Sequence, residues 1–211
     1  MKLIIATPSP YARKARIALF EKGIRHDAVV DVPWNTGTTA PAYNPLGQVP
    51  ILIPPDHAPV YDSRVILQYL EMHTPEPALL PQDPQARLRH LQLEALADGL
   101  NDAIVLHVLE DARKPELRSA DWKTRQRAKI DAGLKGLNTI VEAGGGAYVV
   151  DDAFGLADIA IGCALGYAAL RLPDLRWQQT YRALYLYSTG LEARQSFQAT
   201  QPVSQGIDPL A

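Results

Sequence analysis

The feature that most constrains this fold is a change of pattern at the proline-rich segment Thr74–Pro84, which carries four prolines in eleven residues. Before this segment, short apolar runs alternate with amphipathic helical spacing; after it, only helical spacing is found. Proline lacks an N–H and interrupts both helices and central strands, so the segment indicates a linker. The pattern predicts an α/β unit over residues 1–76, a linker over 77–85 and an all-helical unit over 86–211.

The first unit has the pattern of a small mixed sheet with helices on its faces. Helices are predicted from Ser9-Pro10 to Lys22 and over Ser63–His73, each beginning at a residue that caps helices well. Four strands are predicted, at Lys2–Ala6, Ala28–Val30, Val49–Ile53 and Pro59–Tyr61. The order is therefore βαβ followed by ββα, with a parallel first pair and an antiparallel second pair.

The second unit is predicted to contain only helices. Apolar residues recur at helical spacing in five segments: Arg87–Leu109, Trp122–Val141, Leu156–Leu170, Arg176–Tyr187 and Thr189–Phe197. The tail from Thr200 to Ala211 is expected to run over the surface.

Composition excludes several classes of protein. A net charge of −2 without a basic stripe argues against nucleic-acid binding. The longest apolar run, Ile159–Leu170, is too short to span a bilayer, and the N-terminus lacks the pattern of a signal peptide. Cys163, alone in the sequence, cannot form an internal disulfide, and the five histidines lack the spacing of metal ligands. We expect a cytoplasmic protein that binds neither membrane nor metal.

The segment Asn44–Ser63 concentrates the signals for function. A turn at its start leads into an apolar run that contains Pro50, where proline does not fit a fully paired strand. The segment ends at Asp62 and Ser63, which open a helix. Free N–H groups and the helix dipole favour an anion at such a position. The residues thus predict a surface that reads a peptide backbone beside an anion site.

Several motifs together resemble those of the cytosolic glutathione S-transferases, over roughly Lys2–Phe197. They are TPSPYARKARIAL, NPLGQVPIL, YDSRVILQYL, EALADGLNDA and GLADIAIGCAL. The resemblance implies a thioredoxin-like N-terminal domain, an all-α C-terminal domain, a homodimer, and glutathione as co-substrate. It is closest to bacterial transferase-like proteins with serine at the active-site position.

The resemblance implies a role for Ser9 as the donor of a hydrogen bond to the glutathione sulfur, which favours the thiolate. Thr7 and Tyr11 are neighbouring hydroxyls that are alternatives for this role, and the alternative for Ser9 itself is that it only caps the helix. The family's Val-Pro bond is cis, which implies a cis Val49–Pro50 bond whose flanking N–H and C=O pair with the backbone of glutathione.

Other contacts with glutathione follow from the same resemblance. Ser63 would bind the γ-glutamyl carboxylate and Asp62 the ammonium, roles that are compatible with helix capping. Contacts near the glycine end are expected from Trp34, Asn35 and Gln48, with loop packing as the alternative. A further contact with the ammonium is expected from Asp98 across a dimer interface; a solvated helix charge is its alternative.

The sequence also departs from the family pattern. Ser9 and Ala12 stand where a dithiol motif has cysteines, which disfavours disulfide exchange. Gly155 stands where the second domain's helix-start motif has Ser or Thr three residues before Asp158, so we expect a modest loss of stability. The predicted function is glutathione transfer to an electrophilic small molecule. The alternatives are a glutathione-binding protein with little activity, or a glutathione-dependent isomerase, lyase or peroxidase.

Overall fold

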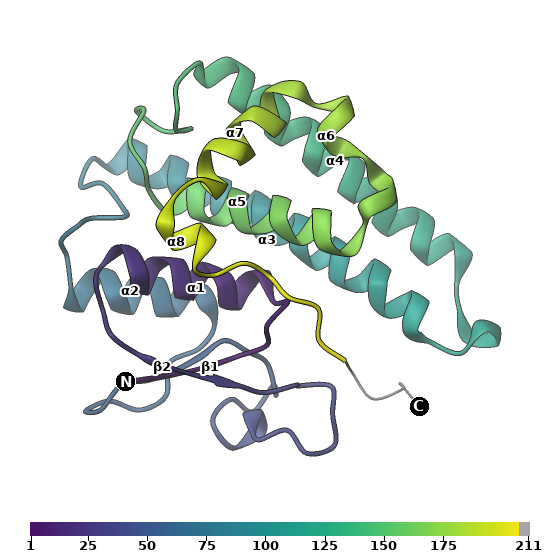
Figure 1. Ribbon diagram of the computed structural model, residues 1–211, viewed down its shortest axis with the longest axis horizontal. Helices are drawn as coiled ribbons and strands as arrows, with labels where there is room; N and C mark the ends of the chain where they lie inside the picture. The colour runs from purple at the N-terminus through teal and green to yellow at the C-terminus, as the bar shows by residue number, and fades with distance from the viewer. Residues whose placement is uncertain (207–211) are drawn as a thin grey trace. The chain divides into compact units, whose positions relative to one another are not determined.

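The structure, a computed structural model, describes residues 1–206. They form two compact units: Met1–Leu79 together with residues 196–206, and Leu80–Gln195. The first unit contains a small mixed sheet and the second is helical (Figure 1). The boundaries at residues 76 and 86 stay a prediction, and the grouping of residues 196–206 with the first unit is a feature that the sequence pattern did not indicate.

The first unit is built on a three-stranded sheet in the order β2-β1-β3. The strands are β1 (Lys2–Ile5), β2 (Asp27–Val30) and β3 (Ile51–Ile53). β1 pairs in parallel with β2 and antiparallel with β3, as predicted. The fourth predicted strand is reduced to an isolated antiparallel bridge between Leu52 and Val60, and β3 begins only after Pro50 because proline has no N–H for the ladder.

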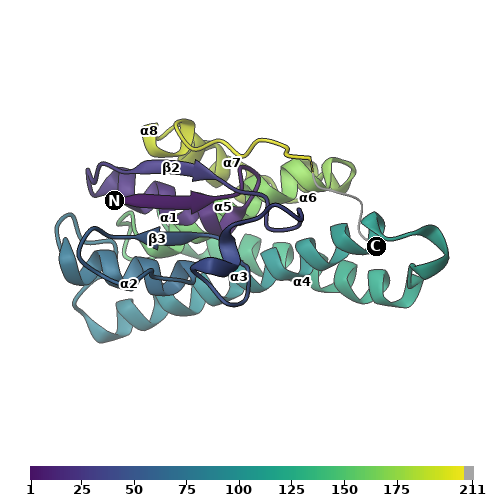
Figure 2. The same cartoon turned by 90° about the horizontal axis from the view of Figure 1, so that it is seen from below.

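Both predicted helices of this unit are present, α1 (Pro10–Glu21) and α2 (Ser63–His73). Figures 1 and 2 show them side by side against the sheet. Successive side chains of a strand point to opposite faces, so the buried Leu3 and Ile5 point away from the face of Ile4. On that second face a hydrophobic cluster brings Ile4 and Ile51 together with Ala40 from η1, a short 3-10 turn (Ala40–Ala42).

The second unit contains helices and no strand among its described residues. Its main helices are α3 (Pro84–Ala112), α4 (Ala120–Gly144), α5 (Leu156–Arg171), α6 (Trp177–Thr180) and α7 (Arg182–Glu192); short 3-10 turns are η2 (Pro115–Leu117) and η3 (Pro173–Leu175). α3 packs against both α4 and α5 (Figure 1). The two last predicted helices were wrong in their bounds: the chain breaks at Tyr181, α7 continues through Ser188-Thr189, and α8 (Gln195–Gln198) is separate.

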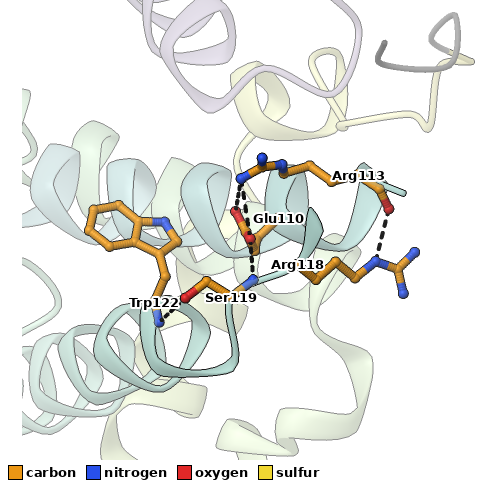
Figure 3. Close-up of polar contacts among 5 residues, drawn as sticks. All are labelled: Glu110, Arg113, Arg118, Ser119 and Trp122. Atoms are coloured by element: carbon orange, nitrogen blue, oxygen red, sulfur yellow. Dashed lines mark hydrogen bonds and ion pairs between the residues drawn. The ribbon is translucent and has the colours of Figure 1, made fainter. Parts of the chain in front are cut away.

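The turn between α3 and α4 is fixed by the buried carboxylate of Glu110 (Figure 3). It accepts a 2.6 Å hydrogen bond from the Ser119 backbone N–H, which lowers the pKa of the Glu110 carboxyl, and the Arg113 guanidinium lies 3.4 Å away. Ser119 in turn caps α4 by accepting from the Trp122 N–H at 3.2 Å, and Arg118 donates to the Arg113 carbonyl. These contacts join α3 and α4 into an antiparallel hairpin.

The N-terminus of α5 lies in the core of the second unit. Asp158, fully buried, accepts hydrogen bonds from the N–H groups of Gly155 (2.9 Å) and Val149 (3.1 Å) and from the Tyr187 hydroxyl (2.7 Å). Burial raises the pKa of the Asp158 carboxyl, and these three donors act in the opposite direction. Gly155 has no side chain with which to complete a capping box.

A histidine from another helix supplies part of the missing cap. The Nδ1 atom of His90, on α3, accepts from the Ala157 N–H in the first turn of α5 at 3.1 Å. An amide N–H can only donate, so Nδ1 carries no proton and the ring is neutral. Burial lowers the pKa of His90, although the charge of Asp151 raises it.

No single helix among residues 1–206 is long and apolar enough to cross a membrane; one sharply bent pair, Leu156–Arg171 with Pro173–Thr180, meets the length and composition requirement only jointly.

Candidate glutathione site

Four segments of the first unit meet at one end of its sheet. Ile5, the last residue of β1, pairs with Val30, the last residue of β2, so the chain leaves both strands at this end. Ile51, the first residue of β3, pairs with Ile4, so Val49-Pro50 reaches the sheet there as well. Because Val60 bridges Leu52 in the antiparallel sense, the chain after Val60 returns toward the start of β3. The pairing register thus brings the segments that contain Ser9, Trp34, Val49 and Asp62 to the same end.

The Val49–Pro50 peptide bond is cis, as the family resemblance implied. Val49 packs against the cluster of Ile4, Ala40 and Ile51. Its backbone N–H and C=O make no hydrogen bond to any of the described residues. An unpaired backbone beside a strand is able to accept an extended peptide as an added strand.

Asn44 holds the loop before this bond, a role that sequence reasoning missed although it identified the turn. The buried Asn44 side chain donates to the Gln48 carbonyl at 2.9 Å and accepts from the Leu46 N–H at 3.0 Å. The turn also needs Gly47, whose φ of +62° is costly for other residues. Asn44 therefore fixes the position of Gln48 and, through it, of Val49.

Asp62 and Ser63 stand at the N-terminus of α2, as predicted. One oxygen of Asp62, Oδ1, accepts from the N–H groups of Arg64 (3.0 Å) and Val65 (3.4 Å), so Asp62 caps the helix. Its second oxygen, Oδ2, has no hydrogen bond to a described residue. Ser63 is almost fully buried, and its N–H and hydroxyl have no partner among the described residues. These donors, with the positive end of the helix dipole, suit a carboxylate.

Ser9 is the N-cap of α1. Its Oγ accepts from the Ala12 N–H at 3.2 Å, which leaves the hydroxyl proton without an acceptor among the described residues. Thr7 differs, because its hydroxyl donates to the Val203 carbonyl at 3.0 Å. The structure therefore shows that Ser9 caps its helix, and it shows a donor at Ser9 that Thr7 does not offer.

The loop after β2 holds the predicted contacts for the glycine end of glutathione. It is closed at its base by Asp31, whose Oδ2 accepts from the N–H (2.9 Å) and the hydroxyl (2.8 Å) of Thr39. Burial raises the pKa of Asp31, but the hydrogen bonds from Thr39 and Thr38 outweigh it and the pKa is lowered. Within this loop the side chain of Trp34 is half exposed. Asn35 is half buried, and Gln48 is exposed in the neighbouring loop.

Asp98 belongs to the second unit, where it lies on α3 and is 3% exposed. The alternative of a solvated helix charge is therefore wrong for Asp98 within the single chain, whereas Asp102, one turn later, is exposed. Helix spacing alone placed the two carboxylates on one face but did not indicate that packing covers only the first.

Two hollows of about 360 and 570 Å³ lie on the second unit, and none of the candidate site residues lines them. In the smaller one Arg127 is paired with Asp131 at 2.9 Å and Lys123 with Asp111. The charges of these two cations are already matched within the protein, which disfavours the smaller hollow as a site for glutathione. Among residues 1–206 no group of three His, Cys, Asp or Glu side chains is arranged to hold a metal ion.

The sequence matches known families in both units. Residues 8–73 match the glutathione S-transferase N-terminal domain, and residues 120–189 match the glutathione S-transferase C-terminal domain. The chain is 38% identical over 207 residues to the uncharacterized GST-like protein YibF of Escherichia coli K12, covering 96% of this chain and 98% of YibF. The chain therefore belongs to the glutathione S-transferase family.

Two relatives bear on its activity. A glutathione S-transferase from Methylobacterium radiotolerans, solved in complex with glutathione sulfonate, superposes with a TM-score of 0.95 at 45% identity, covering 100% of this chain and 98% of that one. The maleylacetoacetate isomerase of Pseudomonas aeruginosa is 30% identical over 213 residues, covering 96% of this chain and 98% of the isomerase. Similarity thus extends to glutathione-binding structures and to an isomerase.

Proposed function

We propose that this protein is a glutathione transferase that uses Ser9 to stabilise the glutathione thiolate and presents it to an electrophilic small molecule. The observation that carries the proposal is the meeting of four segments at one end of the sheet, where Val49 and Ser63 retain unpaired hydrogen-bonding groups. The complex of the M. radiotolerans relative with glutathione sulfonate supports glutathione as the ligand.

Each group would take one part of glutathione. The backbone of Val49 would pair with the cysteinyl backbone, the donors of Ser63 would bind the γ-glutamyl carboxylate, and Oδ2 of Asp62 would accept from the ammonium. Trp34, Asn35 and Gln48 would contact the glycine end. Asp98 would approach the ammonium from the second subunit of a homodimer in the cytoplasm.

Ser9 would act by favouring the charged form of the sulfur. Its hydroxyl is able to donate to the sulfur while Oγ continues to accept from the Ala12 N–H, because a hydroxyl accepts through its oxygen lone pairs and donates through its proton. The N-terminus of α1 adds a positive potential. A lowering of the thiol pKa by roughly two units corresponds to about 2.7 kcal/mol of preferential binding of the thiolate. The thiolate would then form a C–S bond with the electrophile, whose leaving group departs.

The test is Ser9→Ala, read by the thiolate absorbance of bound glutathione against pH and by conjugation of glutathione to a chlorinated nitrobenzene. We expect the apparent thiol pKa to rise and kcat to fall while glutathione still binds. Ser9→Thr, which keeps the hydroxyl, is the matched control. An unchanged thiol pKa in Ser9→Ala would show that Ser9 is only a helix cap.

An isomerase is the second candidate, because the P. aeruginosa maleylacetoacetate isomerase aligns along nearly the whole chain. An isomerase would add the thiolate to a conjugated double bond and release it again, so glutathione would not be consumed. Isomerisation of maleylacetoacetate without loss of free thiol, together with no conjugation of several electrophiles, would favour this candidate. Tight glutathione binding without either reaction would favour a binding protein.

A further inference from the structure

The larger of the two hollows on the second unit, of about 570 Å³, is lined mostly by groups that donate hydrogen bonds. It lies at the contact between α6 and α7, which are neighbours in the fold (Figure 1). The residues that line it are Pro173, Arg176, Gln178, Gln179, Arg182 and Tyr185. They supply two guanidinium groups, two carboxamides and a phenol, but no carboxylate. We call this the arginine hollow.

The two hollows differ in how their cations are neutralised. In the smaller hollow both cations are paired with a carboxylate, as Arg127 is with Asp131 at 2.9 Å. In the arginine hollow, neither Arg176 nor Arg182 has an ion pair with any of residues 1–206. Asp174, two residues before Arg176, is not paired with it either. The arginine hollow therefore holds two positive charges that the described part of the chain leaves without a counter-charge.

The guanidinium of Arg182 lies against another residue that lines the hollow. Its central carbon is 5.5 Å from the centre of the Tyr185 ring, one turn later on α7. Stacking of this kind uses the flat face of the guanidinium and leaves the N–H donors, which lie in its plane, available to a ligand. Because the Arg182 side chain makes no hydrogen bond to any of residues 1–206, these donors are open to an oxyanion.

Arg176 has a backbone conformation that glycine adopts more easily. Its φ of +47° and ψ of +34° lie in the left-handed region, where the Cβ atom of any other residue is crowded. Its side chain is exposed at the hollow. Arg176→Gly therefore removes the guanidinium without straining the backbone, which makes this position suitable for a test of binding.

The number of donors indicates the kind of anion. Guanidinium groups bind the oxygens of carboxylates and phosphates through paired N–H donors. A carboxylate carries one charge and two oxygens, which a single guanidinium matches. A phosphoryl group carries about two negative charges and three acceptor oxygens at neutral pH, so it is able to neutralise Arg176 and Arg182 together. The carboxamides of Gln178 and Gln179 offer further N–H donors.

We propose that the arginine hollow binds a phosphoryl group, free or carried by a small molecule, through Arg176 and Arg182. None of the residues proposed to bind glutathione lines this hollow, so the site is independent of the proposed function. Its volume lies within the range of roughly 300–1,000 Å³ that is usual for small-molecule sites, so it has room for more than the phosphoryl group. The chain has a net charge of −2, so binding of a polyanion requires a local positive site such as this one.

The test measures the dissociation constants of pyrophosphate, ADP and succinate by calorimetric titration of the full chain at low salt. Pyrophosphate is a free phosphoryl anion, ADP carries phosphoryl groups on an organic molecule, and succinate is a dianion with carboxylates only. We expect pyrophosphate and ADP to bind at one site per chain, at least about fivefold more tightly than succinate. The tighter of the two identifies the source of the phosphoryl group. Succinate that binds as tightly as both would overturn the assignment to a phosphoryl group.

Variants separate the arginine hollow from the overall charge of the protein. Arg176→Gly and Arg182→Gln should each weaken the tighter phosphoryl ligand by about fivefold or more, and Arg176→Gly should not lower the melting temperature. Arg182→Lys keeps the charge but loses the paired donors, so its affinity should lie between those of Arg182→Gln and the natural chain. The matched control is Arg127→Gln, which removes the same charge from the smaller hollow and should change the affinity by less than about twofold.

Three further outcomes would overturn the inference. They are the absence of binding of pyrophosphate and ADP to the full chain, an equal loss of affinity in Arg127→Gln, and displacement of the bound ligand by glutathione. The last outcome would make the hollow a glutathione site and would contradict the proposed function as well. An unchanged thiol pKa in Ser9→Ala would contradict the proposed function alone, so the two proposals fail separately.

Discussion

The N-termini of α2 and α5 both carry an aspartate, but they differ in whether the protein itself supplies the hydrogen-bond partners there. Both place an aspartate at the start of the helix: Asp62 as the N-cap of α2, and Asp158 in the first turn of α5. At α5 the protein supplies every partner that Asp158 needs, and His90 accepts from a further amide. At α2 the N–H and hydroxyl of Ser63 are left without a partner among the described residues. A helix N-terminus whose polar groups are all paired within the protein, as at α5, stabilises the fold. One with unpaired donors, as at α2, is able to bind a ligand. We call the first the filled helix end and the second the open helix end.

The largest expected effect comes from removing the Asp158 carboxylate, which accepts hydrogen bonds at the filled helix end. Asp158→Ala leaves two buried donors and one partly buried donor without acceptors, at about 1–3 kcal/mol each, so we expect the free energy of unfolding to fall by roughly 4 kcal/mol. Asp158→Asn is the matched variant, because its Oδ1 is still able to accept from Val149 and Tyr187, and it should lose less. Urea unfolding measures both. Equal losses in the two variants would contradict this account.

Asp62→Ala makes the corresponding change at the open helix end. The loss of the cap should lower the free energy of unfolding by about 1 kcal/mol. Glutathione affinity should fall further, by about 1.5–3 kcal/mol, because a charge-assisted bond to the ammonium is lost. Calorimetric titration with glutathione checks the second value. A variant that loses stability but binds glutathione normally would place Asp62 with Asp158, as a structural residue only.

His90 makes the filled helix end sensitive to pH. The pKa of His90 is lowered in the folded protein, whereas in the unfolded chain it keeps the ordinary histidine value near 6.5. Below that pH the unfolded chain therefore binds a proton more readily than the folded protein does. Stability therefore falls as pH decreases through about 6.5, and protonation of Nδ1 also removes the acceptor for Ala157. We expect His90→Gln, which does not titrate, to flatten the dependence of unfolding free energy on pH between 7.5 and 5.5. An identical slope in both proteins would exclude His90 as the cause.

The smallest expected effect is a gain. Gly155→Ser gives α5 the side-chain cap that the sequence lacks, and the φ of −163° at Gly155 is extended backbone that any residue adopts. Serine exceeds glycine as an N-cap by a few tenths of a kcal/mol, so we expect a gain of about 0.5 kcal/mol in the free energy of unfolding. Gly155→Ala lacks the hydroxyl and serves as the control. A gain of the same size in both would assign the effect to the unfolded chain.

Local signals in the sequence predicted much of the fold. The bounds of α2 follow from a capping aspartate and apolar spacing, and the observed helix spans the predicted Ser63–His73. The break at Tyr181 was missed because no glycine or proline marks it. The cis bond before Pro50 was predicted only through the resemblance to a family.

The contacts that sequence reasoning missed join residues far apart in the chain. His90 and Ala157 are 67 positions apart, and Thr7 and Val203 are 196 positions apart. No periodicity or spacing connects such pairs, because they meet only through tertiary packing. The candidate roles of Ser9, Val49 and Ser63 were accessible because each belongs to a short motif. The contact between Thr7 and Val203 was not, because the two residues lie far apart in the sequence.

The return of residues 196–206 to the first unit also bears on the order in which the protein is made. Arg13, Arg16 and Glu21 precede the helical unit Leu80–Gln195 in the chain, and their partners near Phe197 follow it. The first unit therefore cannot reach its final packing until the whole helical unit between these residues has been synthesised. A domain exchange cut at residue 79 alone would separate α1 from the segment that completes its packing, so a functional exchange has to carry residues 1–79 and 196–206 together.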